Sequence, residues 1–300
     1  MPLASTPAQR LARARRSLDG LSVGDAFGER FFGPPEVWIG WLEARAIAAP
    51  GPWTWTDDTA MALALVDTLA ADDRVDPDAF VERLAARYWL DRYRGYGHGA
   101  HRLFEAIAYG RPWRDAAAEL FGGEGSFGNG GAMRVAPLGA YFADDLDRVV
   151  DEARRSAIVT HAHPEGQAGA IAVAVAAAVL AAEPDPPVDR MFAEVLARTP
   201  ASATRDGVVA ATELLDAPAL APVVARLGNG EGISSQDTVP LCLWAVARHP
   251  RDFAAAMWTT VAALGDRDTT CAIVGGIVAA SAGGAATIPS AWLTAREPLD

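Results

Sequence analysis

The chain has 300 residues, 51% of them hydrophobic, and a formal net charge of −12. This length can bury a large core, and the apolar content excludes an intrinsically disordered chain. The negative charge argues against nucleic-acid backbones and anionic membranes as general partners. An acidic surface can serve solubility alone, whereas carboxylates concentrated in a cleft could hold cations.

Helical patterns recur along the chain. Alanine is frequent, and β-branched or aromatic runs bounded by turns are scarce, which favours helices over strands. The segments 168–182 and 269–282 are apolar on nearly all faces, so we expect them at the centre of the fold. Without a long linker or a fixed-period repeat, the sequence predicts one compact all-α domain over residues 1–300, with a motif-bearing core at about 12–284. The predicted helices cover residues 7–19, 59–72, 77–89, 99–109, 130–141, 145–159, 165–183, 188–198, 203–215, 236–248, 251–263 and 269–282.

The cysteines and the apolar segments indicate a cytoplasmic protein. Cys242 and Cys271 lie in apolar helical patterns without metal-binding spacing, so we expect buried free thiols in a reducing compartment. The basic segment 1–20 lacks an apolar core of signal-peptide length. The segment 168–182 is short and alanine-rich for a bilayer span, so we expect no membrane partner. We also expect a monomer.

The segment GLSVGDAFGERFFG at residues 20–33 combines small residues and acids at helical spacing. Gly24 and Gly28 are four residues apart, so on a helix they form one face that permits close packing. Asp25 and Glu29 have the same spacing and place two carboxylates on a neighbouring face. Tight helix packing beside two solvated acids explains the pattern as well as an acidic site does.

The segment WTWTDDTAMALAL at residues 53–65 places two aspartates at the start of a predicted helix. Asp57 or Asp58 can cap the helix by accepting hydrogen bonds from its first N–H groups, which leaves the other without a structural role. The helix dipole softens their repulsion, and a bound divalent cation would remove it. Carboxylates and the Thr56 hydroxyl are hard oxygen donors that suit Mg²⁺ or Mn²⁺. Trp53 and Trp55 have two possible roles. They could pack in the core, or they could form a wall of the site against an adenine or a ribose.

The segment GDRDTT at residues 265–270 repeats this donor set near the other end of the chain. Asp266, Asp268 and Thr269 come directly before an apolar helical run. One such cluster is weak evidence, because adjacent or alternating aspartates are common. Two clusters with matching donors indicate one shared site, whose four carboxylates would suit two divalent ions.

The segment GEGSFGNGGAMRVAPLG at residues 123–139 is rich in glycine and opens a predicted helix. Such a loop lets backbone N–H groups approach a phosphate or diphosphate, with a flexible loop as the alternative. It matches neither a Walker A motif nor a GxGxxG motif after a strand. Arg134 could pair with a phosphate or, as is commoner, with an internal carboxylate.

The segment THAHPEGQAGA at residues 160–170 places His161 and His163 before a helix of small residues. Two histidines can bind a transition metal, but no third nitrogen or sulfur ligand is in view. Contact with a substrate and a hydrogen bond at the helix entry are the remaining interpretations for these side chains.

Together these segments resemble the ADP-ribosylglycohydrolase family. The matching pieces are GDAFG, TDDT, GNGGAMRVAPLG, TH followed by PEG, and GDRDT followed by GG, in the family's order over residues 20–280. The resemblance implies an all-helical fold with a binuclear Mg²⁺ or Mn²⁺ centre at the base of a cleft. The metal ligands that it implies are Thr56, Asp57, Asp58, Asp266, Asp268 and Thr269. The ligand-binding residues that it implies, with the loop holding the diphosphate and distal ribose of ADP-ribose, are Gly125, Ser126, Phe127, Gly128, Asn129, Gly130 and His161.

Two positions depart from the family's pattern. Family members often carry a glutamate eight residues after the first glycine of GDAxG, where it reaches the metal site, and here that residue is Phe32. Glu29 lies three residues earlier and would point elsewhere on a continuous helix, unless an altered loop brings it in. Arg267 stands where a small or neutral residue is common, and pairing with a phosphate or with Glu29 is expected.

The resemblance predicts a metal-dependent hydrolase that cleaves the N- or O-glycosidic bond of an ADP-ribosyl group and releases ADP-ribose. The group would be carried by a modified protein, a nucleic-acid end or a small molecule. Bound metals would orient the ribose and an attacking water, whose proton would pass to Asp57 or Asp58, or to Glu29. The alternatives are a non-catalytic ADP-ribose or nucleotide sensor, a glycosidase of another ribosyl compound, and a structural protein with relic motifs.

Overall fold

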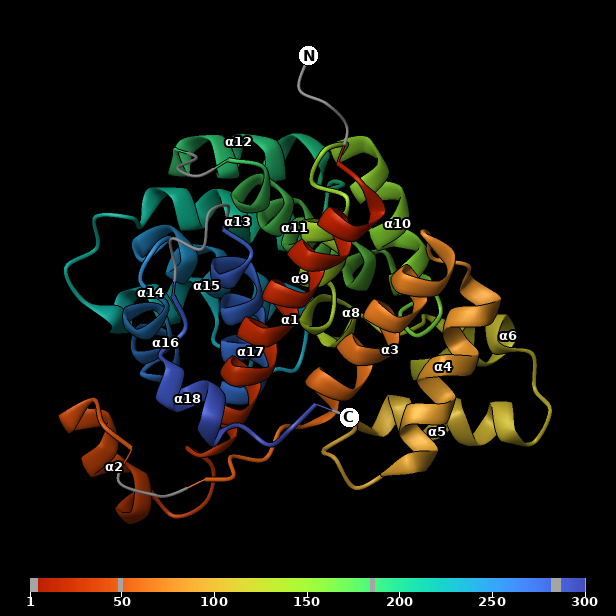
Figure 1. The fold of residues 1–300 in the computed structure, drawn as a ribbon, viewed down its shortest axis with the longest axis horizontal. Coiled ribbons are helices and arrows are strands. Elements are labelled where there is room, and N and C mark those ends of the chain that lie inside the picture. The colour runs from red at the N-terminus through yellow and green to blue at the C-terminus, as the bar shows by residue number, and fades with distance from the viewer. Residues whose placement is uncertain (1–4, 48–50, 184–186, 282–286, 300) are drawn as a thin grey trace.

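The computed structural model describes residues 5–47, 51–183, 187–281 and 287–299, and within these ranges the chain forms helices and no β-strand (Figure 1). Two isolated bridges join Trp53 to Arg296 and Gly128 to Ser234. The prediction of an all-α fold is confirmed. The helices are α1 (Pro7–Glu29), α2 (Pro35–Ala44), α3 (Asp57–Asp72), α4 (Pro77–Leu90), α5 (His98–Ala108), α6 (Trp113–Ala118), α7 (Leu120–Gly123), α8 (Gly130–Met133), α9 (Ala136–Tyr141), α10 (Leu146–Ile158), α11 (Pro164–Ala182), α12 (Val188–Arg198), α13 (Ala203–Glu213), α14 (Leu220–Leu227), α15 (Ser235–Arg248), α16 (Phe253–Val261), α17 (Arg267–Ala279) and α18 (Ser290–Ala295).

The predicted helices differ from the observed ones in two places that matter for the site. α1 continues to Glu29, well past the predicted end at residue 19, because its glycines pack against another helix instead of ending it. The predicted helix over 130–141 is divided into α8 and α9. Pro137, near the start of α9, has no N–H to donate to the carbonyl four residues earlier, which favours a break in the helix there.

Several short helices were not predicted, and parts of two predictions fall on residues that the structure does not describe. The helices that the sequence patterns did not reveal are α2, α6, α7, α14 and α18. Residue 282, the predicted end of the last apolar helix, and residues 283–284 of the predicted core lie outside the described ranges. The single domain over residues 1–300 stays a prediction.

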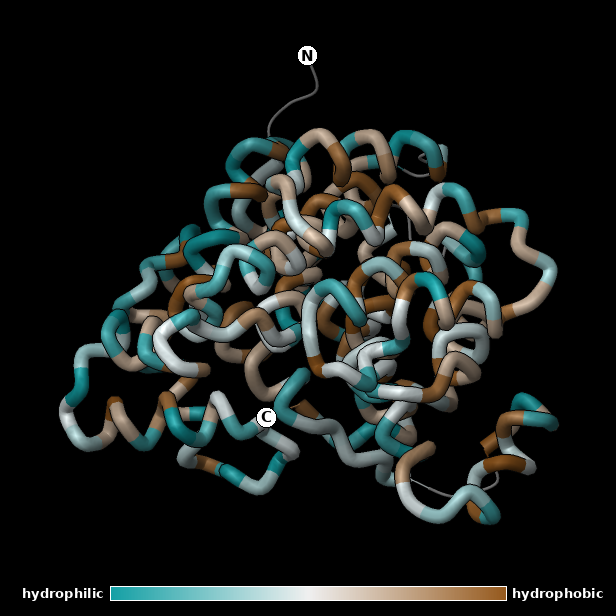
Figure 2. Tube along the Cα trace, turned by 180° about the vertical axis from the view of Figure 1, so that it is seen from behind, coloured by the Kyte–Doolittle hydropathy of each residue, from teal (hydrophilic) through white to brown (hydrophobic). Residues whose placement is uncertain are grey.

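α11 and α17 occupy the interior, as their apolar sequences predict. Every residue of α11 from Ala168 to Ala181 is buried, and the hydrophobic stretches of the trace lie mainly inside the molecule (Figure 2). By length and composition α11 would also qualify as a membrane span, but 83% of its most apolar window is buried within the protein. The helix therefore has the environment of a core helix.

α1 and α17 lie in direct backbone contact, side by side through the middle of the fold (Figure 1). A Cβ atom added to Gly24 would lie 2.1 Å from the carbonyl oxygen of Cys271, and one added to Gly28 would lie 2.2 Å from that of Arg267. The Ser17 hydroxyl donates a hydrogen bond of 2.8 Å to the Gly276 carbonyl. The small-residue face predicted in α1 thus brings its C-terminal end to the N-terminus of α17.

Replacement of Gly24 with alanine tests this contact. The added methyl group would force the two backbones apart, and overpacking of this kind costs about 1–3 kcal/mol of unfolding free energy. We expect Gly24→Ala to lower the melting temperature by several degrees.

The matched control is Gly40→Ala, because Gly40 is exposed within α2 and a Cβ there would meet nothing within 4 Å. Alanine is the better helix former, so this variant should be neutral or slightly stabilised. Equal melting temperatures for the two variants would contradict the proposed close packing of α1 and α17.

Candidate metal centre and ligand cavity

The carboxylate of Asp25 is fully buried and ties α1 to the N-terminus of α3. It accepts hydrogen bonds from the backbone N–H groups of Thr56 and Thr59 at 2.9 and 3.0 Å. The hydroxyls of the same two threonines also donate to it, at 2.9 and 2.5 Å. These bonds favour an ionised Asp25, but burial and the negative charge of Asp268 outweigh them and raise its pKa to about 7.

Thr56, and neither aspartate, caps α3. The Thr56 hydroxyl accepts a hydrogen bond of 3.4 Å from the backbone N–H of Asp58, and α3 begins at Asp57. The prediction that one aspartate of the pair caps the helix is therefore wrong. Because the threonine takes this role, the side chains of Asp57 and Asp58 are both left for another purpose.

Three carboxylates from three helices meet beside this helix end. Asp25, Asp58 and Asp268 each offer an oxygen, and these oxygens lie within 4.8 Å of one another. The Oδ1 atoms of Asp58 and Asp268 are buried and have no hydrogen-bond partner. Buried acceptors without partners are costly, and a bound cation would supply the missing partner. The donor set is purely oxygen, which fits Mg²⁺ or Mn²⁺.

The electrostatics of the acidic cluster also favour a bound cation. Burial, followed by the charges of neighbouring aspartates, raises the pKa of Asp57 and of Asp58 well above the usual range. Burial and Asp268 raise the pKa of Asp266 to about 8. The carboxylates cannot all be ionised at neutral pH without a counter-charge, since like charges repel strongly in a poorly solvated site. A proton or a metal ion must supply it.

The structure brings all six predicted metal ligands together. Asp57, Asp266, Asp268 and Thr269 line one cavity, Asp58 belongs to the carboxylate cluster, and the Thr56 hydroxyl lies 3.0 Å from Asp58 Oδ2. Asp266 also accepts a hydrogen bond of 2.7 Å from the side-chain amide of Asn129.

The structural role of Asp25 was missed from the sequence. Its spacing from Glu29 was visible, but its threonine partners lie in another segment. One signal in the sequence points to this role. The glycines on either side of Asp25 indicate a buried helix face, and a buried carboxylate needs polar partners.

The cavity beside the acidic cluster has a volume of about 420 Å³, a size typical of small-molecule sites. Six of the seven predicted ligand-binding residues line it: Ser126, Phe127, Gly128, Asn129, Gly130 and His161. Gly125 is outside this lining. It has a φ of +77°, and a Cβ there would lie 2.7 Å from the backbone nitrogen of His163, so it serves the turn.

Part of the cavity lining was not predicted. It includes the start of α5 at His98 and Gly99, the ring of Phe121, and Ile233 from the segment before α15. The rings of Phe121 and Phe127 lie 6.0 Å apart. No motif marks these positions in the sequence, because the turns that bring them to the cavity are irregular.

The two histidines of the segment 160–170 have different roles. His163 caps α11, and its Nδ1 accepts a hydrogen bond of 3.1 Å from the backbone N–H of Glu165. The interpretation as a helix-entry hydrogen bond is thus confirmed for His163. His161 lines the cavity, where burial and the positive charge of Arg134 lower its pKa to about 3.

Arg134 forms neither of the pairs expected from the sequence. It is fully buried and donates hydrogen bonds to the Ser156 carbonyl at 2.6 Å and the Thr160 hydroxyl at 2.9 Å. Its guanidinium lies 5.4 Å from the centre of the Phe80 ring. The Ser156 carbonyl near the C-terminal end of α10, the Thr160 hydroxyl and this ring stabilise the cation in place of a phosphate or a carboxylate.

Arg267 also differs from expectation, because it binds the connection between α1 and α2 and not Glu29. Its guanidinium donates a hydrogen bond to the Phe31 carbonyl and lies 5.1 and 4.8 Å from the rings of Phe32 and Trp38. Glu29 ends α1 half-buried, where burial and the charge of Asp268 raise its pKa to about 7. Phe32 therefore belongs to an apolar clamp around Arg267.

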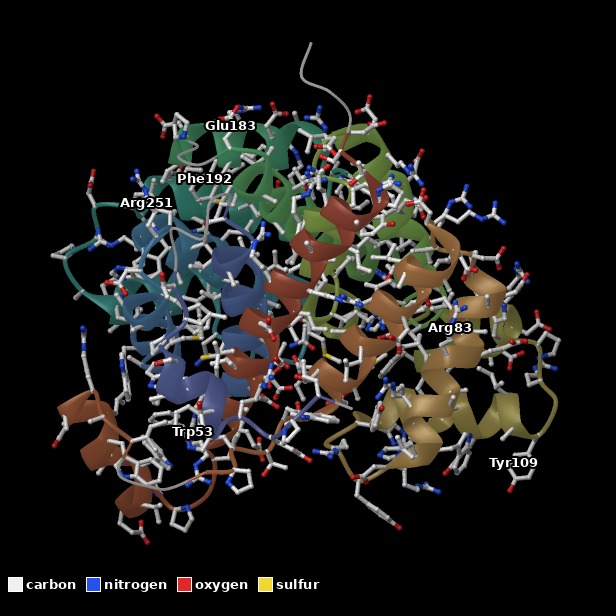
Figure 3. All side chains as sticks on the ribbon, viewed as in Figure 1. Trp53, Arg83, Tyr109, Glu183, Phe192 and Arg251 are labelled. Carbon is white, nitrogen blue, oxygen red and sulfur yellow. The ribbon has the colours of Figure 1, made fainter. Side chains whose placement is uncertain are left out.

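Trp53 and Trp55 pack in the core, as the first of their two interpretations predicts. Trp53 lies 6.3 and 5.9 Å from the rings of Phe27 and Trp292, at the lower end of the molecule in Figure 3. Arg94 stacks on Trp55 at 3.7 Å. Neither tryptophan is among the residues found to line the cavity.

Comparison with known proteins agrees with this geometry. Residues 6–299 match the family model described as ADP-ribosylglycohydrolase. The chain is 30% identical to "ADP-ribosylhydrolase ARH3" of Homo sapiens, over 95% of this chain and 89% of that protein. It is 32% identical to an uncharacterized protein of Archaeoglobus fulgidus, over 93% of this chain and 90% of the relative.

A solved structure has the same architecture. The chain described as "ADP-ribosylglycohydrolase-related protein complex" matches with a TM-score of 0.68 and 27% sequence identity, over 97% of this chain and 94% of that one. The match of the family model over nearly the whole chain, and relatives at 30% identity or more over most of their own length, establish that the chain belongs to the ADP-ribosylglycohydrolase family.

Proposed function

We propose that this protein is a metal-dependent hydrolase that cleaves the N- or O-glycosidic bond of an ADP-ribosyl group and releases ADP-ribose. The observation that carries the proposal is the pair of buried, unpartnered carboxylate oxygens of Asp58 and Asp268. Asp268 also borders a cavity whose other walls include the glycine-rich loop and His161. Oxygen ligands for hard cations thus stand next to a loop suited to a diphosphate.

Two Mg²⁺ or Mn²⁺ ions are proposed as cofactors. Asp25 already accepts four hydrogen bonds from two threonines, so we assign it mainly to positioning α3. When bound, such ions supply Lewis-acid chemistry at ribose hydroxyls and lower the pKa of water. The residues proposed to hold them are Thr56, Asp57, Asp58, Asp266, Asp268 and Thr269.

The residues of the chain divide the remaining work. Backbone N–H groups of the loop 126–130 would bind the diphosphate and orient the distal ribose toward the acids. An ionised aspartate would accept the proton of the attacking water. Asp57 suits this role best, because its side chain borders the cavity, whereas Glu29 is not part of the lining found for it.

The second candidate function is a non-catalytic ADP-ribose sensor. It is favoured by one observation, that Phe32 occupies the usual glutamate position and its ring lies 5.1 Å from the Arg267 guanidinium. Calorimetry together with product analysis separates the two functions. A sensor would bind ADP-ribose tightly and release none from conjugates on serine, arginine or nucleic-acid ends.

Removal of one ligand carboxylate should abolish metal-dependent stabilisation. Because a cation binds only the folded site, Mg²⁺ or Mn²⁺ at about 100 times its dissociation constant should add about 2.7 kcal/mol to the unfolding free energy. We expect thermal melting to show this rise for the unaltered protein and for Asp216→Asn, whose carboxylate is exposed. The rise should vanish in Asp268→Asn, and its persistence there would contradict the proposed site.

The same variants should separate in activity. Asp268→Asn should release ADP-ribose from modified serine, arginine or nucleic-acid ends roughly 100-fold to 1,000-fold more slowly, since loss of metal charge stabilisation costs several kcal/mol. Asp216→Asn is the control for a change of surface charge, and mass spectrometry of free ADP-ribose gives the rate. Full activity of Asp266→Asn/Asp268→Asn in a chelator would refute metal-dependent hydrolysis.

The pKa values predict an unusual pH dependence for the metal-free protein. Asp25 and Asp266 ionise in the folded state at about 7 and about 8, whereas unfolded aspartates ionise at about 4. Between about pH 4 and about pH 8 the folded state therefore holds more protons, so the contribution of these groups to stability falls as pH rises.

Melting temperatures of chelator-treated protein should therefore fall from about pH 5 to about pH 8. Excess Mg²⁺ should reduce this fall, because it replaces the protons as counter-charge. A slope that Mg²⁺ leaves unchanged would show that these carboxylates are not the groups involved.

A further inference from the structure

A chain of hydrogen bonds runs behind the cavity from Arg134 through Thr160 to His161. Arg134 Nη2 lies 2.9 Å from the Thr160 hydroxyl oxygen, and this oxygen lies 2.7 Å from His161 Nδ1. All three side chains are buried, with 0%, 5% and 8% of their surface exposed. The arrangement decides which nitrogen of His161 carries the proton.

The chemistry of arginine fixes the direction of the hydrogen bond between Arg134 and Thr160. A guanidinium has donors and no acceptor, so the Thr160 oxygen must accept the hydrogen bond from Arg134. Burial lowers the pKa of Arg134 to about 9, which leaves it charged at neutral pH. The hydroxyl proton of Thr160 is therefore directed elsewhere.

Two distances show which atom accepts the hydroxyl proton of Thr160. The hydroxyl of Thr160 can donate to His161 Nδ1 at 2.7 Å or to the Ala157 carbonyl at 3.5 Å. Hydroxyl hydrogen bonds have donor–acceptor distances of about 2.5–3.0 Å, so only the histidine lies within the normal range. Nδ1 is then the acceptor, and a neutral imidazole that accepts at Nδ1 carries its proton on Nε2.

His161 Nε2 faces the glycine-rich loop. A Cβ atom added to Gly128 or to Gly130 would lie 3.3 Å from Nε2 in either case. His161 borders the cavity, and within the described parts of the chain no hydrogen bond to Nε2 is formed. The absence of side chains at these two glycines keeps the nitrogen accessible.

From these contacts we infer that Arg134 and Thr160 are positioning residues that hold His161 as the neutral Nε2–H tautomer, which donates a hydrogen bond to an oxygen of the ligand above the loop. The ligand part of this inference rests on the proposed function. The tautomer part concerns the protein alone. A phosphate oxygen and a ribose oxygen are both acceptors of the required kind.

This assignment gives His161 one chemical role. With Nδ1 occupied by Thr160 and Nε2 protonated, the ring has no free lone pair with which to bind a metal or to take a proton from water. It acts as a fixed donor, and its orientation is maintained without a carboxylate partner. A backbone carbonyl or a carboxylate commonly fixes a histidine by accepting a hydrogen bond from one of its ring nitrogens. Thr160 fixes His161 in the same way, but it donates the hydrogen bond and the ring nitrogen accepts it.

Nitrogen NMR of the full-length protein labelled with [¹⁵N]histidine tests the tautomer directly. The two ring nitrogens have distinct shifts when protonated and unprotonated, and the His161 signals are identified by their loss in His161→Asn. We expect an unprotonated Nδ1 and a protonated Nε2. A protonated Nδ1 would overturn the inference, whether or not ADP-ribose binds.

Two matched substitutions test the role of Thr160. Thr160→Ser keeps the hydroxyl and should keep the single tautomer, whereas Thr160→Val keeps the shape and should give a mixture of tautomers. Calorimetry with ADP-ribose should show binding roughly fivefold weaker for Thr160→Val, the equivalent of one neutral hydrogen bond, with binding restored in Thr160→Ser.

The outcomes separate this inference from the proposed function. An unchanged tautomer in folded Thr160→Val would overturn the positioning role of Thr160. If the valine variant does not fold, the spectrum of the unaltered protein still decides the tautomer. Failure of ADP-ribose to bind any of these proteins, with the Nε2–H tautomer observed, would instead refute the proposed function and the ligand part of the inference.

Discussion

The acidic site depends on the contact between α1 and α17. Gly24 and Gly28 allow the backbones to approach until an added Cβ would collide with carbonyl groups of α17. Because of this approach, Asp25 near the end of α1 and Asp268 at the start of α17 present carboxylates to the same volume. Any larger residue at these glycines would separate the acids. The geometry of the site therefore depends directly on the packing of the two helices.

Asp25 extends this constraint to a third helix. Its hydrogen bonds to Thr56 and Thr59 fix the N-terminus of α3, and Thr56 in turn caps that helix. Asp57 and Asp58 are consequently spared from capping and can serve as ligands. The arrangement is unfavourable without a counter-charge, because burial and mutual repulsion raise the pKa of the acids. The proposed binding site for cations is thus maintained by contacts that do not themselves require the cation.

The sequence was informative where a pattern is local and uninformative where partners come from distant segments. The two aspartate clusters at residues 56–59 and 265–270 could be joined into one site because their donor sets match. The buried role of Asp25 could not, since it depends on threonines more than thirty positions away. Helix boundaries failed at α1 because glycine, which usually ends helices, here serves packing.

The arginines show the same limit. Charge alone suggests acidic or phosphate partners for Arg134 and Arg267. Instead, Arg134 binds a carbonyl near the end of α10, and the Arg267 guanidinium lies close to two aromatic rings. A buried cation can be satisfied by dipoles and ring faces, which leave no mark in the sequence near the arginine. Family membership likewise leaves the acceptor and linkage of the substrate open, because these depend on the walls of the cavity and not on the shared motifs.

We propose above all that Asp58 and Asp268 hold a catalytic cation beside bound ADP-ribose. Anomalous diffraction from crystals grown with Mn²⁺ and ADP-ribose tests it most directly. We expect manganese peaks in contact with both carboxylates and the distal ribose at the same end of the cavity. ADP-ribose bound in the cavity with no manganese at these two aspartates would contradict it.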